Sequence, residues 1–358
     1  MKKNILFLIS LDSVLLILIF LFKLYFQPIA IVVPHHNIVK EKRLEFFKTI
    51  AQKRPVTKKI IIIGPDHFSP YQNTISYSNF NWNLSNGEIK FNSSLETKLK
   101  PFLSLQNSIV KNDHAIYNLL PDIKFVWPNS QVFPILVGQN YPISKLNNLI
   151  NELKNVCNYD CLLISSVDFS HYLPAAFANV HDQKSIYDLS TQNLTEIPKL
   201  EVDSPQSLYV LTKYSILKNA HKWDLFYHSN SGEIANDPDI ETTSHVLGFY
   251  QRSFFKNKIT KVETYLISKN IDSKKSLNSL GKRFFYGTDY IDLNYSSKSS
   301  YILPFDLADD MVVTVVVADN KPTFTFFPTE IKNGATYFLR GQEKINKLNY
   351  VKFIYGIK

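Results

Sequence analysis

The sequence predicts an α/β domain with a mostly parallel central sheet flanked by helices. Near-continuous apolar runs alternate with segments of helical spacing over residues 29–256. Unbroken runs of Ile, Val and Leu are typical of parallel strands that are covered on both faces. Because 45% of the 358 residues are hydrophobic, the chain can bury a core of substantial size. An apolar N-terminal run and an aromatic-rich C-terminal tail flank this domain.

Five apolar runs predict the strands of the central sheet, and five segments with helical spacing predict its helices. The predicted strands cover residues 30–33, 59–63, 131–138, 161–171 and 244–255. The predicted helices cover residues 39–54, 94–105, 112–128, 143–156 and 203–220. The run KIIII at 59–63 is interpreted as a central strand, and Asp203 is interpreted as the cap of the last helix.

The N-terminal run from Ile5 to Phe22 predicts a transmembrane anchor over residues 1–28. As a helix the run spans roughly 27 Å, close to the thickness of the hydrocarbon core. Asp12 interrupts the run, but the apolar residues around it offset its cost. No small-residue cleavage site follows, which favours an uncleaved anchor over a signal peptide. We therefore expect a single-pass membrane anchor and an extracytoplasmic location for the folded domain.

The C-terminal part of the chain changes to an aromatic-rich alternation from about residue 282. This pattern predicts a β-rich accessory module, with a hairpin that turns at Asp319–Pro322. The predicted organisation is an anchor over 1–28, an α/β domain over 29–256, a linker or helix over 257–281, and the β-rich module over 282–358.

The net charge of +9 comes mostly from lysines that are spread singly and in pairs. No nucleic-acid-binding pattern accompanies them, so we expect no nucleic-acid partner. Cys157 and Cys161 are the two cysteines of the chain. They lack the second pair that a tetrahedral zinc site needs, and either a disulfide or two thiols fits their spacing.

Polar residues follow three of the predicted strands at their C-terminal ends. They are His35, His36, Asp66, His67, Asp168, Ser170 and His171. In open α/β sheets this edge is where ligands bind. Imidazoles suit Fe, Cu, Zn or Ni, and two histidines with one carboxylate suit non-haem Fe(II). The sequence therefore predicts a metal site at this rim, with ordinary surface or core histidines as the alternative. Asp66 either orients His67 or caps the turn.

Six segments together resemble the Memo family, whose bacterial members are called AmmeMemoRadiSam system protein B. The segments are VVPHHN, IIIIGPDHFSP, NDHAIYNLLPDIKFVWP, VFPILVG, LLISSVDFSHY and FYHSNSGEI. They occur in the order of the family's motifs over roughly residues 29–255. The resemblance implies a fold similar to that of the class III extradiol dioxygenases, which bind non-haem iron.

The resemblance also implies roles for individual residues. His35 and His67 match metal ligands, and Glu233 stands where some members have Asp and others Cys. Three residues would line the pocket, namely His114, Asp168 and His171. Either His171 or His114 would act as the acid/base. A carboxylate in the ligand set favours Fe(II), with Cu or Zn as alternatives. In the third motif Asp113 replaces Glu, Ala115 replaces Ser, and Tyr117 replaces the second Glu.

Two classes of function follow from these residues. The first is a metal-dependent, non-haem iron oxidoreductase that acts on an unknown small molecule. The second is a non-catalytic binding or scaffold protein that retains the dioxygenase-like pocket. By the name of the system, the implied protein partners are its A protein and its radical-SAM protein.

Overall fold

The computed structural model describes residues 2–68, 73–173, 175–237 and 240–254 and five strands further along the chain. Contacts divide the chain into two units. The first unit comprises Met1–Val167, Gln206–Tyr227 and Leu247–Asn257. The second unit comprises Asp168–Pro205, His228–Val246 and Lys258–Lys358. The domain boundaries that we predicted from the sequence stay predictions.

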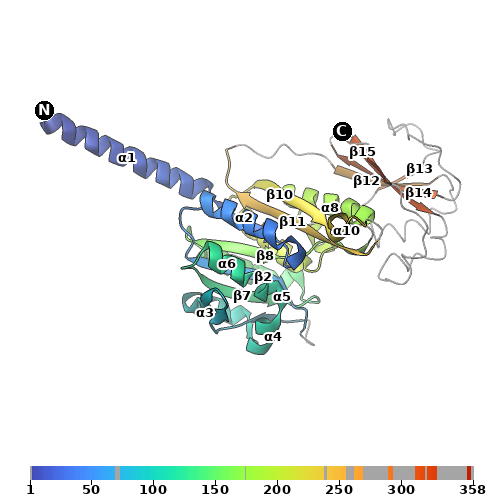
Figure 1. Cartoon of the computed structure of the whole chain (residues 1–358), viewed down its shortest axis with the longest axis horizontal. Helices are drawn as coiled ribbons and strands as arrows, with labels where there is room; N and C mark the ends of the chain where they lie inside the picture. The colour runs from blue at the N-terminus through green and yellow to red at the C-terminus, as the bar shows by residue number, and fades with distance from the viewer. Residues whose placement is uncertain are drawn as a thin grey trace. The chain divides into compact units, whose positions relative to one another are not determined.

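Four parallel strands form the centre of the larger sheet, in the order β1-β8-β2-β7 (Figure 1). They are β1 (Pro28–Val33), β8 (Cys161–Ser166), β2 (Lys59–Pro65) and β7 (Gln131–Val137). Every residue of β2 from Ile60 to Pro65 is buried, as expected for a central strand covered on both faces. The prediction of an α/β fold with a central sheet flanked by helices is confirmed.

Antiparallel and short strands extend this parallel centre on both sides. β11 (Thr242–Gln251) pairs with β1, and β3 (Ile75–Tyr77) pairs with β7, both antiparallel. The other strands are β4 (Trp82–Leu84), β5 (Gly87–Phe91), β6 (Ser104–Leu105), β9 (His171–Leu173) and β10 (Lys222–Asn230). We did not predict β3 to β6, because strands this short carry too few residues for a recognisable period.

Three helices of the first unit pack against the central strands. In Figure 1, α2 (Lys40–Lys53), α5 (His114–Tyr117) and α6 (Leu120–Val126) lie across one face of the strands. Side chains from these helices form one hydrophobic cluster with residues of β1, β2, β7 and β8. The helices α3 (Ser93–Leu99), α4 (Asn107–Asn112) and α7 (Asn147–Val156) also belong to this unit. So does α9 (Pro205–Leu217), except for its first residue, Pro205, which is assigned to the second unit.

Two predicted helices are shorter than the sequence pattern indicated. The helix expected over 94–105 ends at Leu99 and continues as a 3-10 turn that contains Pro101. The segment expected as helix over 112–128 divides into α5 and α6, and Pro121 lies in the first turn of α6. Proline lacks the N–H that a helix interior requires, which explains both interruptions.

The N-terminal helix α1 (Lys2–Phe26) corrects the prediction of a membrane anchor. In the described part of the chain, no helix combines the length and the apolar character that crossing a membrane demands. Asp12 and Lys23 place charged residues within the sequence of this helix, and charged residues are costly in a hydrocarbon core. The structure thus contradicts the anchor over residues 1–28 and the extracytoplasmic location that depended on it.

A smaller sheet in the second unit has the strand order β13-β12-β14-β15-β16. Its strands are β12 (Val262–Ser268), β13 (Asp289–Asp292), β14 (Met311–Ala318), β15 (Lys321–Pro328) and β16 (Phe353–Tyr355). The antiparallel pairing of β14 with β15, which closes at Ala318 and Lys321, confirms the predicted hairpin. β12 lies where we predicted a linker or a helix, because the β-branched and aromatic residues of VETYLIS favour a strand.

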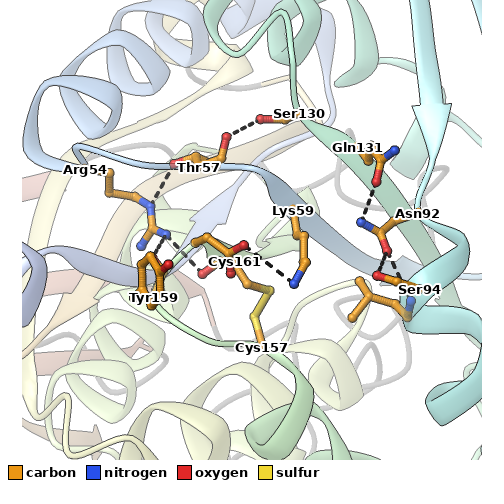
Figure 2. A network of polar contacts seen from close by, with 12 residues as sticks. Arg54, Thr57, Lys59, Asn92, Ser94, Ser130, Gln131, Cys157, Tyr159 and Cys161 are labelled. Atoms are coloured by element: carbon orange, nitrogen blue, oxygen red, sulfur yellow. Dashed lines mark hydrogen bonds and ion pairs between the residues drawn. A yellow bond between two sulfur atoms is a disulfide. The ribbon is translucent and has the colours of Figure 1, made fainter.

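The buried Arg54 connects several segments at the N-terminal ends of the parallel strands (Figure 2). Its guanidinium donates to the carbonyl oxygens of Tyr159 and Cys161 at 3.1 Å each, and to that of Pro28. Burial lowers the pKa of Arg54 to about 10, which leaves it charged at neutral pH. One side chain thereby holds the starts of β1 and β8 together.

The two cysteines form a disulfide between the C-terminal cap of α7 and the first residue of β8 (Figure 2). Both cysteines are buried, and their Cα atoms are 5.0 Å apart. The structure therefore decides between the disulfide and the two thiols that the sequence left open. The bridge closes the loop whose Tyr159 and Cys161 carbonyls accept from Arg54.

Replacing both cysteines, as in C157A/C161A, is expected to lower the free energy of unfolding by about 2 kcal/mol. This is the chain-entropy value for a closed loop of about five residues. Thermal melting with and without a reducing agent measures the effect. Reduction should lower the melting temperature of the wild type and leave that of the double variant unchanged. Equal sensitivity of both proteins to reduction contradicts the prediction.

Candidate metal centre

Three histidines of the first unit converge beyond the C-terminal ends of the parallel strands. His35 lies two residues after β1, and His67 lies two residues after β2. Both strands pair with β8 in parallel, which brings their ends to the same edge of the sheet. His114 is the first residue of α5. One ring nitrogen of each histidine lies within 4.8 Å of a ring nitrogen of the other two.

The three imidazole rings are closely arranged. The rings of His67 and His114 are stacked, with centroids 3.9 Å apart and planes 24° apart. His35 lies edge-on to both, at 5.2 Å from His67 and 5.0 Å from His114. His35 is buried, whereas His67 and His114 are partly exposed. A cation bound here would therefore keep a side open to solvent, as catalytic metal sites do.

Asp113 orients His67 and begins the helix that carries His114. Its Oδ1 lies 2.8 Å from His67 Nδ1, and its Oδ2 accepts from the backbone N–H of His67 at 2.9 Å. Oδ1 also accepts from the backbone N–H of Ala115, so Asp113 is the N-cap of α5. Since Nδ1 is engaged, His67 has its Nε2 left to bind a ligand. The sequence showed Asp113 only as a departure from the family motif.

The charge of Asp113 is stabilised by these contacts. Burial by itself would raise the pKa of the Asp113 carboxyl. Its hydrogen bonds to His67 and Ala115 and its attraction to His67 outweigh burial, and the pKa is lowered below its usual value. Asp66, whose role the sequence left open, accepts from the backbone N–H of Phe68 at 3.3 Å, which supports the turn-capping role.

A contact with β8 orients the ring of His35. Its Nδ1 lies 3.2 Å from the hydroxyl of Ser166, and both residues are buried. Ser166 is the last residue of β8 and is paired with Val33 of β1. The contact therefore follows from the parallel register of the two strands. The sequence showed Ser166 as part of an apolar run and gave no signal of this role.

Gly64 allows α5 to approach the sheet closely. A Cβ at this position would lie 2.9 Å from Cβ of Ala115 and 3.2 Å from the carbonyl oxygen of Ser166. The sequence pattern placed Gly64 after the end of the strand, but Gly64 and Pro65 both remain paired with β7. The glycine is required because any side chain here would push away the helix that positions His114.

The other residues that the family resemblance implied belong to the second unit. Asp168 follows β8, and its backbone N–H donates to the carboxylate of Asp203 at 3.1 Å. His171 is the first residue of β9. Glu233 is an exposed residue of α10 (Ser231–Ala235), and its Oε1 accepts from Asn179 Nδ2 at 2.8 Å. The predicted roles of Asp168, His171 and Glu233 stay predictions.

The second unit also contains a buried polar chain that the sequence did not indicate. Asp182 lies within α8 (Ala175–Ser190). Its Oδ1 accepts from the Ser170 hydroxyl, and its Oδ2 contacts His228 Nε2, both at 2.8 Å. Burial disfavours the charged imidazole, but Asp182 outweighs burial and raises the pKa of His228 above its usual value, with a smaller contribution from Glu233.

The rim of this α/β sheet carries three histidines that could hold a metal ion. Similarity to known proteins identifies the family. Residues 15–243 match the family described as Memo-like protein. This match covers more than half of the chain. The chain belongs to the Memo family.

Several MEMO1 family proteins are similar to this chain. The protein of Thermoplasma volcanium is 28% identical over 229 residues, which cover 60% of this chain and 82% of the relative. That of Thermoplasma acidophilum is 23% identical over 225 residues, covering 58% and 81%. That of Nitrosopumilus maritimus is 22% identical over 225 residues, covering 57% and 75%.

Among solved structures, an uncharacterized protein from Escherichia coli K12 is similar to 62% of this chain and 99% of its own. The TM-score is 0.41 and the sequence identity is 10%.

The variant D113N is expected to lose stability at neutral pH but not in acid. Asp113 has a lowered pKa in the folded chain, so its charge stabilises the fold above its unfolded pKa of about 3.9. This contribution disappears as the pH falls through the folded pKa. We expect the wild type to exceed D113N by about 1–3 kcal/mol at pH 6. Urea unfolding between pH 3 and 7, with a chelator present, should show that difference shrinking below about pH 4.

The variant H228Q is expected to show the opposite pH dependence. A raised pKa means that charged His228 stabilises the fold below about pH 6.5, and that this is lost as the pH rises through the folded pKa. The stability difference between wild type and H228Q should therefore be largest near pH 6 and decline toward pH 9. H221Q, at an exposed histidine, is the control. A difference that grows with pH contradicts the assignment.

Proposed function

We propose that this protein is a metalloprotein in which His35, His67 and His114 hold a divalent metal ion. The convergence of their ligand atoms within 4.8 Å carries the proposal. The three imidazoles come from three separate segments of the chain, and their ring nitrogens meet in one place. Imidazole is a ligand that suits Fe, Cu, Zn and Ni. Membership of the Memo family agrees with a pocket of this kind.

The ligand set bears on which metal is bound. From the sequence we expected two histidines and the carboxylate of Glu233, a set that favours Fe(II). In the first unit the third potential ligand is His114, a nitrogen donor. Three nitrogen ligands accept Cu and Zn as readily as Fe(II). We propose Fe(II) as the first metal to test because the sequence favoured it, followed by Cu and Zn. Glu233 as a ligand stays a prediction.

The residues around the histidines support a catalytic role. A bound ion would act as a Lewis acid on a small molecule or lower the pKa of a bound water. Asp113 and Ser166 fix the orientation of His67 and His35, so the two rings are held in place before a ligand arrives. His67 and His114 keep the site partly open. We propose a metal-dependent oxidoreductase of unknown substrate, with His171 as a predicted acid/base.

The full-length chain, purified without a chelator and under anaerobic conditions, is expected to carry about one metal ion per molecule. Elemental analysis identifies the metal, and H67A should lose it while retaining the circular dichroism of the folded protein. H221A is the matched control, because His221 is an exposed histidine of the same unit. E233A reports separately whether the carboxylate contributes.

A wild-type chain that is metal-free and takes up no Fe(II), Cu or Zn would contradict this proposal. The pocket would then belong to a non-catalytic binding or scaffold protein. The A protein and the radical-SAM protein of the system remain predicted partners, which co-purification tests directly.

A further inference from the structure

We propose that Asn118 is a positioning residue that sets the spacing of His35 and His114, and that the buried Arg43 holds it in place. The inference rests on the proposed metal site, because it concerns two of the three histidines in it. Arg43 lies outside the six segments by which the sequence indicated that site, and Asn118 lies within the third segment but was assigned no role there. Both emerge only from the hydrogen bonds around α5.

Asn118 connects the helix of one histidine to the backbone of another. It caps the C-terminal end of α5, and its backbone N–H donates to the carbonyl oxygen of His114 at 3.2 Å. Its side-chain Nδ2 donates to the carbonyl oxygen of His35 at 3.0 Å. The rings of His35 and His114 are 5.0 Å apart. A single residue therefore contacts the backbone of both histidines.

Arg43 also connects the same two segments. Its guanidinium donates to the carbonyl oxygens of Pro34 at 3.1 Å and His36 at 3.3 Å, the residues on either side of His35. It also donates to the carbonyl oxygen of Asn118 at 3.1 Å. Because the donors of a guanidinium form a rigid planar fork, they impose a fixed separation on the groups that accept from them.

A substitution at position 118 tests the positioning role of Asn118 and leaves the contacts of Arg43 in place. N118A removes the amide that donates to His35 but keeps the backbone carbonyl that accepts from Arg43. The ion pair between Arg43 and Asp122 therefore remains. Arg43 is a poorer choice, since replacing it leaves the carboxylate of Asp122 buried without its cation.

Asn86 provides a matched control. Its Nδ2 donates to the carbonyl oxygen of Pro121 at 2.8 Å, so N86A also removes one bond from an asparagine amide to the backbone. Pro121 is in α6, the helix that follows α5, and Asn86 makes no described hydrogen bond to the three histidines. The two variants differ in whether the lost bond reaches a histidine.

The test is a Co²⁺ titration of the full chain, followed by the visible absorption bands of the bound ion. We expect N118A to bind Co²⁺ roughly 10–100-fold more weakly than wild type and to shift the absorption bands. Substitutions of groups that hold a metal ligand in place have effects of this size. N86A should keep the wild-type bands and affinity. Both variants should melt near the wild-type temperature. Wild-type affinity and bands in N118A would overturn the proposal.

A second measurement separates this inference from the metal proposal. If the wild type binds no Co²⁺, the metal proposal fails, and the positioning role is judged on the metal-free chain. NMR of protein labelled with ¹³C-histidine resolves the ring signals of its nine histidines. N118A should move the signals of His35 and His114, and N86A should move neither. Unmoved signals in N118A would show that Asn118 positions nothing.

Discussion

The buried ion pair between Arg43 and Asp122 is the interaction on which the geometry of the histidine cluster depends. The two side chains are 0% and 4% exposed and meet at 2.8 Å. Removing both charges from water costs much of what their attraction returns, so the pair adds little net stability. Its effect is geometric instead. The remaining guanidinium donors end on carbonyl oxygens around His35 and at the end of α5, which fixes two ligand-bearing segments relative to each other.

The short helix α5 and its two caps contact all three histidines of the candidate metal site. It carries His114 itself, its N-cap Asp113 holds the ring of His67, and its C-cap Asn118 holds the backbone of His35. A helix of this length has little stability of its own, because nucleation is unfavourable. It persists because its caps are satisfied and because Gly64 leaves room for it against β2. The groups that stabilise α5 are thus the groups that orient the histidines.

The two ends of the parallel strands have different tasks. At the N-terminal end, Arg54 and the disulfide hold β1, β8 and the loop between α7 and β8 together. At the C-terminal end, β1 and β2 lead into the turns that carry His35 and His67. Fixing the strands at one end keeps their register at the other, and the contact of His35 with Ser166 relies on that register.

The sequence by itself determined the parallel strands, the candidacy of His35 and His67 as metal ligands and that of His114 as a pocket residue, because apolar runs and motif order are local properties of the chain. The end of β2 lies two residues beyond the predicted one. The hydropathy of the apolar N-terminal run indicated a membrane anchor, and the structure contradicts this prediction. Only the tertiary structure showed that Asp113 is the partner of His67, that Ser166 and Asn118 hold His35, and that Gly64 admits α5. These contacts join residues far apart in the chain, and a pattern along one sequence carries no information about which distant atoms meet.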